Sequence, residues 1–189
     1  MRDKSYQALV IGASAGGINA IASLLSGLST RFTIPIMIVQ HRLPVLNLFL
    51  TQYWDEAGIF QTKEADDKDS LQSGIAYIAP PNYHLLVEQD KTLSLSIDPK
   101  ICYARPSIDV LFETASDAYQ AHLIGVILTG ANNDGTAGLR RIKAHGGLTI
   151  AQEPNTAEAS TMPQSAINSG AIDKILPLTS IASFLNNLL

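Results

Sequence analysis

The chain has 189 residues, which is enough for one domain with its own hydrophobic core. Hydrophobic residues make up 46% and charged residues 16% of it, so its composition excludes a disordered chain. The formal net charge of −4 argues against nucleic acid and anionic membranes as partners, because both require clustered basic side chains. Cys102 is the single cysteine, which excludes an internal disulfide and predicts a cytoplasmic protein.

The uncharged run 5–30 follows Arg2 and Lys4 and therefore resembles a signal peptide at first sight. Glycines and serines interrupt this run, so it lacks the apolar core of a signal sequence or a membrane span. We interpret it as a strand, a turn and a helix, and we expect no membrane insertion.

Short apolar runs alternate with segments of helical period along the whole chain. In chain order, the patterns predict a strand at 6–12, a helix at 17–28, a strand at 34–40, a helix at 44–57, a solvated charged loop at 63–69, a strand at 75–79, a β-hairpin formed by 85–88 and 92–97, a helix at 106–119, a strand at 123–128, a helix at 136–144, a strand at 148–151, a helix at 163–168, a strand at 172–176 and a helix at 180–188.

Most of the predicted strands are apolar throughout and are separated by helices. Such strands belong to a parallel sheet that is covered on both faces. The sequence therefore predicts a doubly wound, mainly parallel, three-layer α/β/α domain with a β-hairpin insertion.

The turn after the first predicted strand reads Gly12-Ala13-Ser14-Ala15-Gly16-Gly17. Small residues suit a sharp strand-to-helix turn, which would expose the Ser14 hydroxyl beside N–H groups that can stabilise an oxyanion. Taken alone, Ser14 is better explained as the N-cap of a helix. A dinucleotide site fits poorly, because the second strand ends in His41 rather than in an acidic residue.

Three polar residues follow three different predicted strands. Ser14 follows the first, His41 the second, and Asp134 the strand at 123–128. The carboxyl ends of parallel strands line one crevice, so we expect these side chains to meet there. In that arrangement His41 would remove the proton from Ser14, and Asp134 would orient the imidazole. The sequence thus predicts a serine hydrolase, with a residue order unlike that of the α/β-hydrolases.

At this point the chain resembles the catalytic domain of the chemotaxis protein-glutamate methylesterase family (CheB). The stretches that carry the resemblance are VIGASAGG at 10–17, IVQHRLP at 38–44, AYIAPPNYHLL at 76–86, RPSIDVLF at 105–112, GVILTGANNDGTAGL at 125–139 and TIAQEPNTAEASTMPQSAINSGAID at 149–173. The resemblance implies hydrolysis of glutamate γ-methyl esters, and deamidation of certain glutamines, on the cytoplasmic helices of methyl-accepting chemotaxis receptors. It places the family's nucleophile, base and orienting acid on Ser14, His41 and Asp134.

The resemblance also implies one methylesterase domain over 1–189. Members of the family commonly carry an N-terminal phosphoacceptor receiver domain, and we expect none in this chain. A separate receiver domain or a chemotaxis methyltransferase would then be a further partner. No cofactor is implied, and no spacing of Cys, His and carboxylate residues indicates a metal site.

Two positions depart from the pattern of the family. Ala15 stands where threonine is usual, and Gly130-Ala131-Asn132 replaces a glycine–methionine–glycine segment. The backbone N–H groups of Ala15 and Ala131 are the candidates for the oxyanion hole.

Further polar residues support weaker predictions. Arg42 and Arg105 are candidates for attracting an acidic receptor segment, although a solvated surface arginine is the simpler interpretation of each. His84 is expected to have a structural role in the hairpin, and His122 and His145 are expected at the surface.

Two alternative functions remain open: hydrolysis of a small-molecule ester or amide, and a non-catalytic binding module that retains the fold.

Overall fold

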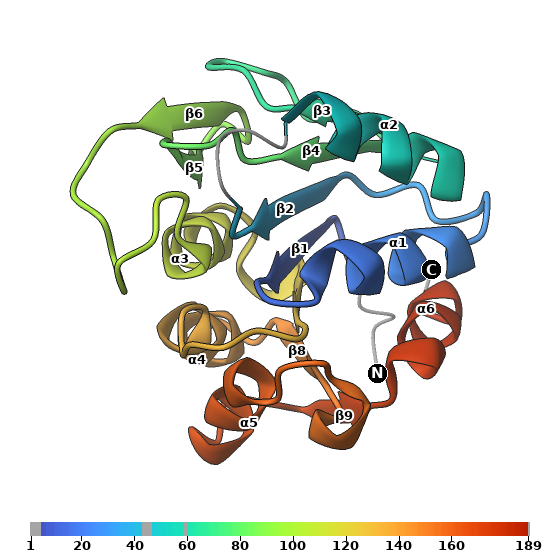
Figure 1. The fold of residues 1–189 in the computed structure, drawn as a ribbon. Coiled ribbons are helices and arrows are strands. Elements are labelled where there is room, and N and C mark those ends of the chain that lie inside the picture. Colours follow the sequence, from blue (N-terminus) through green and yellow to red (C-terminus); the bar gives the residue numbers. More distant parts are fainter. Residues whose placement is uncertain (1–4, 43–46, 59, 189) are drawn as a thin grey trace.

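A computed structural model describes residues 5–42, 47–58 and 60–188 of the chain. The predicted helix start at 44 lies outside the described residues. One parallel sheet runs through the middle of the molecule, with helices on both of its faces (Figure 1). This arrangement confirms the predicted three-layer α/β/α fold.

The sheet has the strand order β3-β4-β2-β1-β7-β8-β9, and every neighbouring pair in it is parallel. The strands are β1 (Ala8–Ala13), β2 (Ile36–Gln40), β3 (Gln61–Glu64), β4 (Ile75–Ile78), β7 (Leu123–Ile127), β8 (Leu148–Gln152) and β9 (Lys174–Leu176). After β1 the chain forms β2, then the edge strand β3, then β4 between those two, and it returns to the other side of β1 with β7. The strand order therefore reverses at β1, and open α/β sheets bind ligands at such a switch point.

The helices divide between the two faces of the sheet (Figure 1). One face carries α1 (Gly17–Gly27), α2 (Asn47–Ala57) and α6 (Leu178–Asn186), and the other carries α3 (Ile108–Tyr119), α4 (Thr136–Ala144) and α5 (Thr161–Asn168). Among the described residues, two short 3₁₀ turns lie in the connections, η2 (Gln120–His122) and η3 (Pro154–Thr156).

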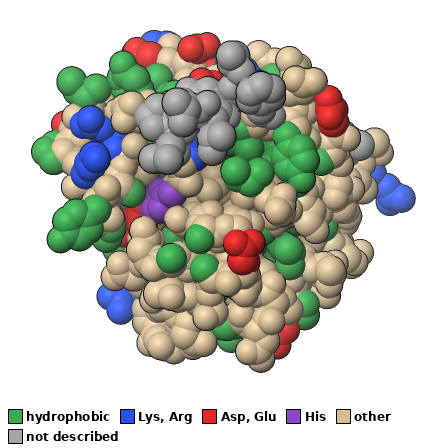
Figure 2. Space-filling view, viewed as in Figure 1, with side chains coloured by type: hydrophobic (Ala, Val, Ile, Leu, Met, Phe, Trp, Pro, Cys, Tyr) green, Lys and Arg blue, Asp and Glu red, His purple; other side chains and the backbone are tan. Residues whose placement is uncertain are grey.

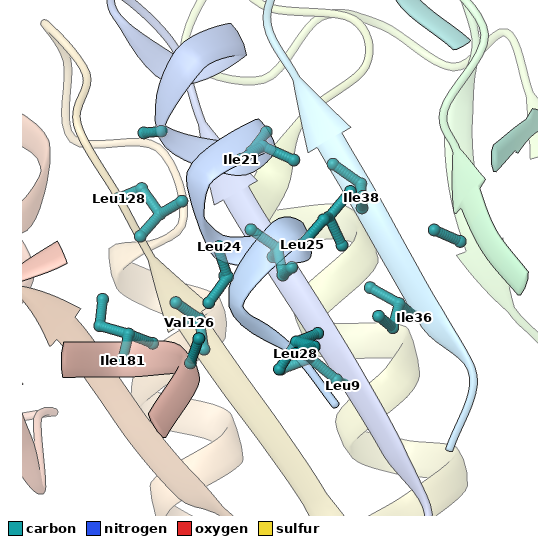
Figure 3. Packing of buried hydrophobic residues seen from close by; sticks show 14 of the residues in the cluster. Leu9, Ile21, Leu24, Leu25, Leu28, Ile36, Ile38, Val126, Leu128 and Ile181 are labelled. Atoms are coloured by element: carbon teal, nitrogen blue, oxygen red, sulfur yellow. The ribbon is translucent and has the colours of Figure 1, made fainter. Parts of the chain in front are cut away.

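Successive side chains of a strand point to opposite faces of the sheet, so each face of the sheet has its own hydrophobic core. In β1, Leu9 and Ile11 pack toward α1, whereas Ala8 and Val10 pack toward α3. Figure 3 shows the first of these cores, where side chains of α1 lie over those of the strands. Leu24 and Leu25 of α1 are fully buried there, and burying each such side chain contributes about 2 kcal/mol. These cores hold β1, β2 and β7 in fixed register beneath the site.

The predicted hairpin is present as β5 (His84–Val87) and β6 (Leu93–Ser96), which pair in antiparallel register as a separate two-stranded sheet. It lies against α3 on one side of the molecule. A loop of residues 97–107 then connects β6 to α3.

The prediction of a solvated loop at 63–69 is wrong in part. Lys63 and Glu64 belong to β3, the edge strand of the sheet, and Ala65 beyond it is buried. Lys63 pairs with Asp69 at 2.9 Å. Charged side chains on an edge strand discourage pairing with another chain, so charge along this segment is compatible with a strand.

Within the described residues, no helix has the length and apolar character needed to span a membrane.

Candidate active site

Ser14 lies on the sharp turn between β1 and α1, as the small residues around it predicted. Its backbone N–H donates to the carbonyl oxygen of Thr129 at 2.9 Å, which ties the turn to the segment after β7. Gly16 has a φ of 74°, a left-handed conformation that favours glycine. A Cβ atom at Gly17 would collide with the side chain of Gln40. The turn therefore requires small residues for steric reasons.

His41 follows β2 and lies beside the Ser14 turn, because its backbone N–H donates to the carbonyl oxygen of Ala13 at 3.0 Å. Its side chain is 13% exposed, and its Nε2 atom lies 2.8 Å from Oδ2 of Asp134. A carboxylate only accepts hydrogen bonds, so Nε2 donates and carries the ring proton. The unprotonated Nδ1 is then the nitrogen that can act as a base.

Asp134 is fully buried at the amino end of α3. Its Oδ2 accepts from His41 and from the N–H of Ile108 at 2.8 Å. Its Oδ1 accepts from the hydroxyl of Ser107 at 2.9 Å and from the N–H groups of Asp109 and Gly135, both at 3.0 Å. Backbone donors at a helix amino end favour a negative charge. This carboxylate is consequently held in one orientation.

The two neighbouring carboxyl groups at this site have pKa values shifted in opposite directions. Burial of Asp134 raises its pKa, but the hydrogen bonds from His41, Asp109 and Ile108 outweigh burial and lower the pKa overall. Burial of Asp109 raises its pKa to about 6, and the nearby charges of Asp134 and Glu113 act in the same direction. Asp134 is therefore ionised at neutral pH, as an orienting acid must be.

The Ser14 hydroxyl has no hydrogen-bond partner within the described part of the chain. It lines the same crevice as His41, a cavity of about 830 Å³ at the carboxyl ends of β1 and β2. Hydrogen bonds between a nucleophile and its base often form only when substrate binds. Ser14 and His41 thus line one crevice, and Asp134 lies buried behind His41 and contacts it.

The oxyanion candidates differ in their position. Ala15 lines the crevice, and its backbone N–H makes no hydrogen bond to any described residue. Ala131 is exposed and does not line the crevice, whereas its neighbour Asn132 does. Asn132 Oδ1 accepts from the N–H of Asp134 at 3.1 Å and thereby closes the turn before this acid. The geometry favours the Ala15 N–H as the donor.

Neither candidate arginine is a solvated surface residue. The Arg42 side chain is only 1% exposed and pairs with Glu64 of β3. Arg105 lines the crevice, but its Nη1 donates to the backbone oxygens of Ile97 and Asp98 at 2.6 and 3.0 Å. Arg42 therefore links the residue after β2 to β3, and Arg105 holds the backbone of the loop before α3. A role of either arginine in substrate binding stays a prediction.

Sequence reasoning missed two residues that support the site, Gln40 and Ser107, and did not predict that His84 contacts one of them. Gln40 is 2% exposed and its Nε2 donates to the carbonyl oxygens of Ser14 and His41, both at 2.8 Å. Ser107 is fully buried and donates to Asp134. His84 accepts from the Ser107 N–H at 3.2 Å through Nδ1. The available signal for Gln40 was a polar residue at the end of an apolar strand. The available signal for Ser107 was a serine directly before a helix.

The remaining histidines have structural contacts. The expected structural role of His84 is supported by its burial and by its Nε2 contact with the carbonyl oxygen of Pro99 at 3.1 Å. His122 contacts the carbonyl oxygen of Ser5 at 2.8 Å. His145 is half-buried, and its Nδ1 lies 3.0 Å from the Ser116 hydroxyl oxygen.

The fold brings Cys102, Asp109 and Asp134 together, although their spacing did not indicate a metal site. Their ligand atoms lie within 4.8 Å of one another. Both oxygens of Asp134 already accept hydrogen bonds, and Asp109 accepts from the Gly138 N–H at 2.8 Å. Burial and the two carboxylates raise the pKa of the Cys102 thiol, so it stays protonated. The donor set fits a hydrogen-bonded cluster better than a metal centre.

The fold and the crevice together define an α/β protein with Ser14 and His41 at the switch point of a parallel sheet and a buried Asp134 paired with His41, the arrangement expected of a serine hydrolase. The family model for the CheB methylesterase matches residues 9–185. The chain therefore belongs to the CheB methylesterase family.

Individual relatives agree with this assignment. A protein from Leptospira interrogans is 52% identical over 94% of this chain and 92% of its own length. The protein-glutamate methylesterase/protein-glutamine glutaminase of Clostridium acetobutylicum is 34% identical over 94% of this chain, which spans 52% of that relative. The crystal structure of the Thermotoga maritima CheB methylesterase catalytic domain superposes with a TM-score of 0.93, at 34% identity, covering 98% of this chain and 100% of that one.

Proposed function

We propose that this chain hydrolyses glutamate γ-methyl esters on the cytoplasmic helices of methyl-accepting chemotaxis receptors and deamidates glutamines at equivalent positions. The observation that carries the proposal is the His41–Asp134 pair beside the Ser14 turn, in a chain of the CheB methylesterase family. Two relatives named protein-glutamate methylesterase/protein-glutamine glutaminase support both reactions. The proposed substrate implies a cytoplasmic location.

In the first step, Nδ1 of His41 accepts the proton of the Ser14 hydroxyl while Oγ attacks the ester carbonyl carbon. The carbonyl oxygen becomes an oxyanion, which the free N–H of Ala15 stabilises. Asp134 accepts the Nε2 proton of the imidazolium in a hydrogen bond, without itself becoming protonated. Its low pKa keeps it negatively charged throughout.

The tetrahedral intermediate then expels the leaving group. His41 transfers its proton to the methoxy oxygen, so methanol leaves and the γ-carbonyl carbon stays bonded to Ser14 Oγ. A water molecule, deprotonated by His41, attacks this acyl-enzyme. The bond between Ser14 Oγ and the γ-carbonyl carbon then breaks, His41 returns the proton to Oγ, and the receptor glutamate is released with a free γ-carboxylate. For a glutamine substrate the leaving group is ammonia.

Methanol release from an enzymatically methylated receptor cytoplasmic fragment tests the proposal. We expect release by the purified chain and none by a Ser14→Ala variant. Hydrolysis of simple esters without release from the receptor fragment would favour the small-molecule alternative. Absence of both activities would favour a non-catalytic module.

A further inference from the structure

The loop between β6 and α3 forms one wall of the crevice, through residues that include Lys100, Cys102 and Tyr103. The Tyr103 side chain is 97% exposed, and Ile97 of the same loop is 71% exposed. Figure 2 shows basic and hydrophobic side chains beside a histidine, on the side where Figure 1 places this loop. An aromatic ring with almost no intramolecular packing contributes little to folding.

The backbone that carries this ring is strained. Ile101 and Ala104 pair through two backbone hydrogen bonds of 3.1 and 2.8 Å, so Cys102 and Tyr103 form a two-residue turn. Both have positive φ values, 48° and 63°. Turns of this kind favour Asn-Gly, because most side chains disfavour the left-handed region. Backbone strain of this kind clusters at active sites and ligand-binding segments, where the surrounding structure holds it in place.

The loop is also held firmly in place. Arg105 donates to the carbonyl oxygens of Ile97 and Asp98, and His84 contacts that of Pro99. The Cys102 sulfur lies within 4.8 Å of carboxylate oxygens of the Asp134 cluster. The turn is therefore anchored above the catalytic acid, while the neighbouring Tyr103 ring faces solvent.

We infer that Tyr103 is a specificity-determining residue that packs against the apolar side of the protein helix carrying the scissile glutamyl group. This inference rests on the proposed function. Exposed Lys100, three residues earlier in the same loop, would pair with an acidic side chain of that helix. The helix carries glutamates wherever methyl groups have been removed, so its charge complements Lys100. Preorganised tyrosines are effective anchors because little side-chain entropy is lost on binding.

The position of Tyr103 distinguishes a protein substrate from a small ester. A small ester bound at Ser14 would lie inside the crevice and would leave the ring largely in solvent. A helix lying across the crevice would cover it. Removal of the ring should therefore impair hydrolysis only when the ester belongs to a large substrate.

The test compares two substrates that share the same scissile bond: a methylated receptor cytoplasmic fragment and N-acetylglutamate α-amide γ-methyl ester. The variant is Tyr103→Gly, because glycine accepts the positive φ of this position and so should preserve the fold. We expect kcat/KM for the receptor fragment to fall about tenfold, mainly through KM, with the small ester unchanged within about twofold. Tyr103→Phe should retain most of the activity on the fragment.

Two further variants complete the design. Ile175→Ala changes another exposed apolar side chain, on β9, and should leave both substrates unaffected. Lys100→Glu should raise KM for the fragment, by an amount that shrinks as salt is added. If Tyr103→Gly unfolds, Tyr103→Asn replaces it, because asparagine also tolerates this conformation.

The outcomes separate the two claims. Wild-type protein that hydrolyses the small ester but not the fragment would contradict the proposed function and this inference with it. Wild-type protein that acts on the fragment, with Tyr103→Gly equally active, would overturn the inference alone. A wild-type dimer that Tyr103→Gly dissociates, at unchanged activity, would assign the ring to a second copy of the chain and would also overturn it.

Discussion

His41 presents Nε2, and not Nδ1, to Asp134, at a distance of 2.8 Å. The ionised carboxylate fixes the ring proton on Nε2, which leaves Nδ1 unprotonated and available as the proposed base for Ser14. In the serine-protease template the acid contacts Nδ1 and the base is Nε2. In the proposed mechanism the roles of the two ring nitrogens are thus exchanged relative to that template.

The first prediction concerns the nucleophile. Ser14→Ala should lower kcat for the γ-methyl ester about 10⁴-fold or more, because no other nucleophile forms the acyl-enzyme. Tm should stay close to wild type, since the Ser14 hydroxyl makes no hydrogen bond to a described residue. Methanol release and thermal unfolding measure the two effects. Ser26→Ala, an exposed serine of α1, is the control. Retained turnover in the folded Ser14 variant would remove this residue as nucleophile.

The second prediction concerns the orienting acid. Asp134→Asn should lower kcat about 10⁴-fold, as the corresponding change does in a serine protease. It should also lower the free energy of unfolding by about 2–4 kcal/mol, because an amide nitrogen would face buried N–H donors. Kinetics and urea unfolding at pH 7 check both values, with the half-exposed Asp117→Asn as control. Equal stability of the Asp134 variant and wild type would contradict the described hydrogen bonds.

The Asp134 effect on stability should depend on pH. Its pKa in the folded protein is lowered, so its contribution is present above the unfolded value of about 3.8 and is lost as pH falls through the folded value. The stability difference between wild type and Asp134→Asn should therefore narrow below about pH 4. A difference that stays constant down to pH 3 would be inconsistent with this shift.

The third prediction concerns Asp109, whose pKa is raised to about 6. The stability that this carboxyl contributes is fully present below its unfolded pKa and is lost as pH rises through 6. Asp109→Asn removes the charge and keeps an oxygen for the Gly138 N–H. We expect the variant to be more stable than wild type at pH 8, by about 2 kcal/mol, with a smaller difference at pH 5. Urea unfolding curves at pH 5 and pH 8 measure this difference in the free energy of unfolding. A difference that is the same at both pH values would argue against the raised pKa of Asp109.

The fourth prediction concerns Gln40, which links the Ser14 and His41 backbones. Gln40→Met preserves the length of the side chain and removes both hydrogen bonds. We expect a loss of about 1–2 kcal/mol in stability and about tenfold in kcat, because the nucleophile and base lose their fixed separation. KM should change little. An unchanged kcat would show that the turn maintains its own geometry.

The fifth prediction concerns Arg42. Its buried guanidinium lies against Glu64, so Arg42→Met should leave KM for the receptor fragment within about twofold of wild type. Lys100→Glu on the crevice wall provides the comparison, since its KM should rise. A large increase in KM for Arg42→Met alone would restore Arg42 as a substrate-binding residue.

Local sequence determined most of the layered fold and the place of the site. Strands such as Ala8–Ala13 are apolar throughout, which requires burial on both faces and hence a parallel sheet under helices. Small residues around Ser14 required a sharp turn. Because the carboxyl ends of parallel strands share one edge, Ser14, His41 and Asp134 were expected at one crevice from their positions after three strands.

The tertiary structure decided the features that depend on distant partners. β3 is polar and charged, and only its pairing with β4 makes it a strand. Arg42 is buried because Glu64 on β3 lies opposite it. Asp134 receives donors from α3, 25 to 27 residues away in sequence, and those contacts select the His41 nitrogen that carries the proton. The strained turn that exposes Tyr103 is held by contacts from His84 and Arg105. The periodicity of apolar residues shows which face of a helix or strand is buried. Hydrogen bonds and ion pairs between elements depend instead on which residues lie close together in the folded chain, and the sequence around each residue does not reveal those partners.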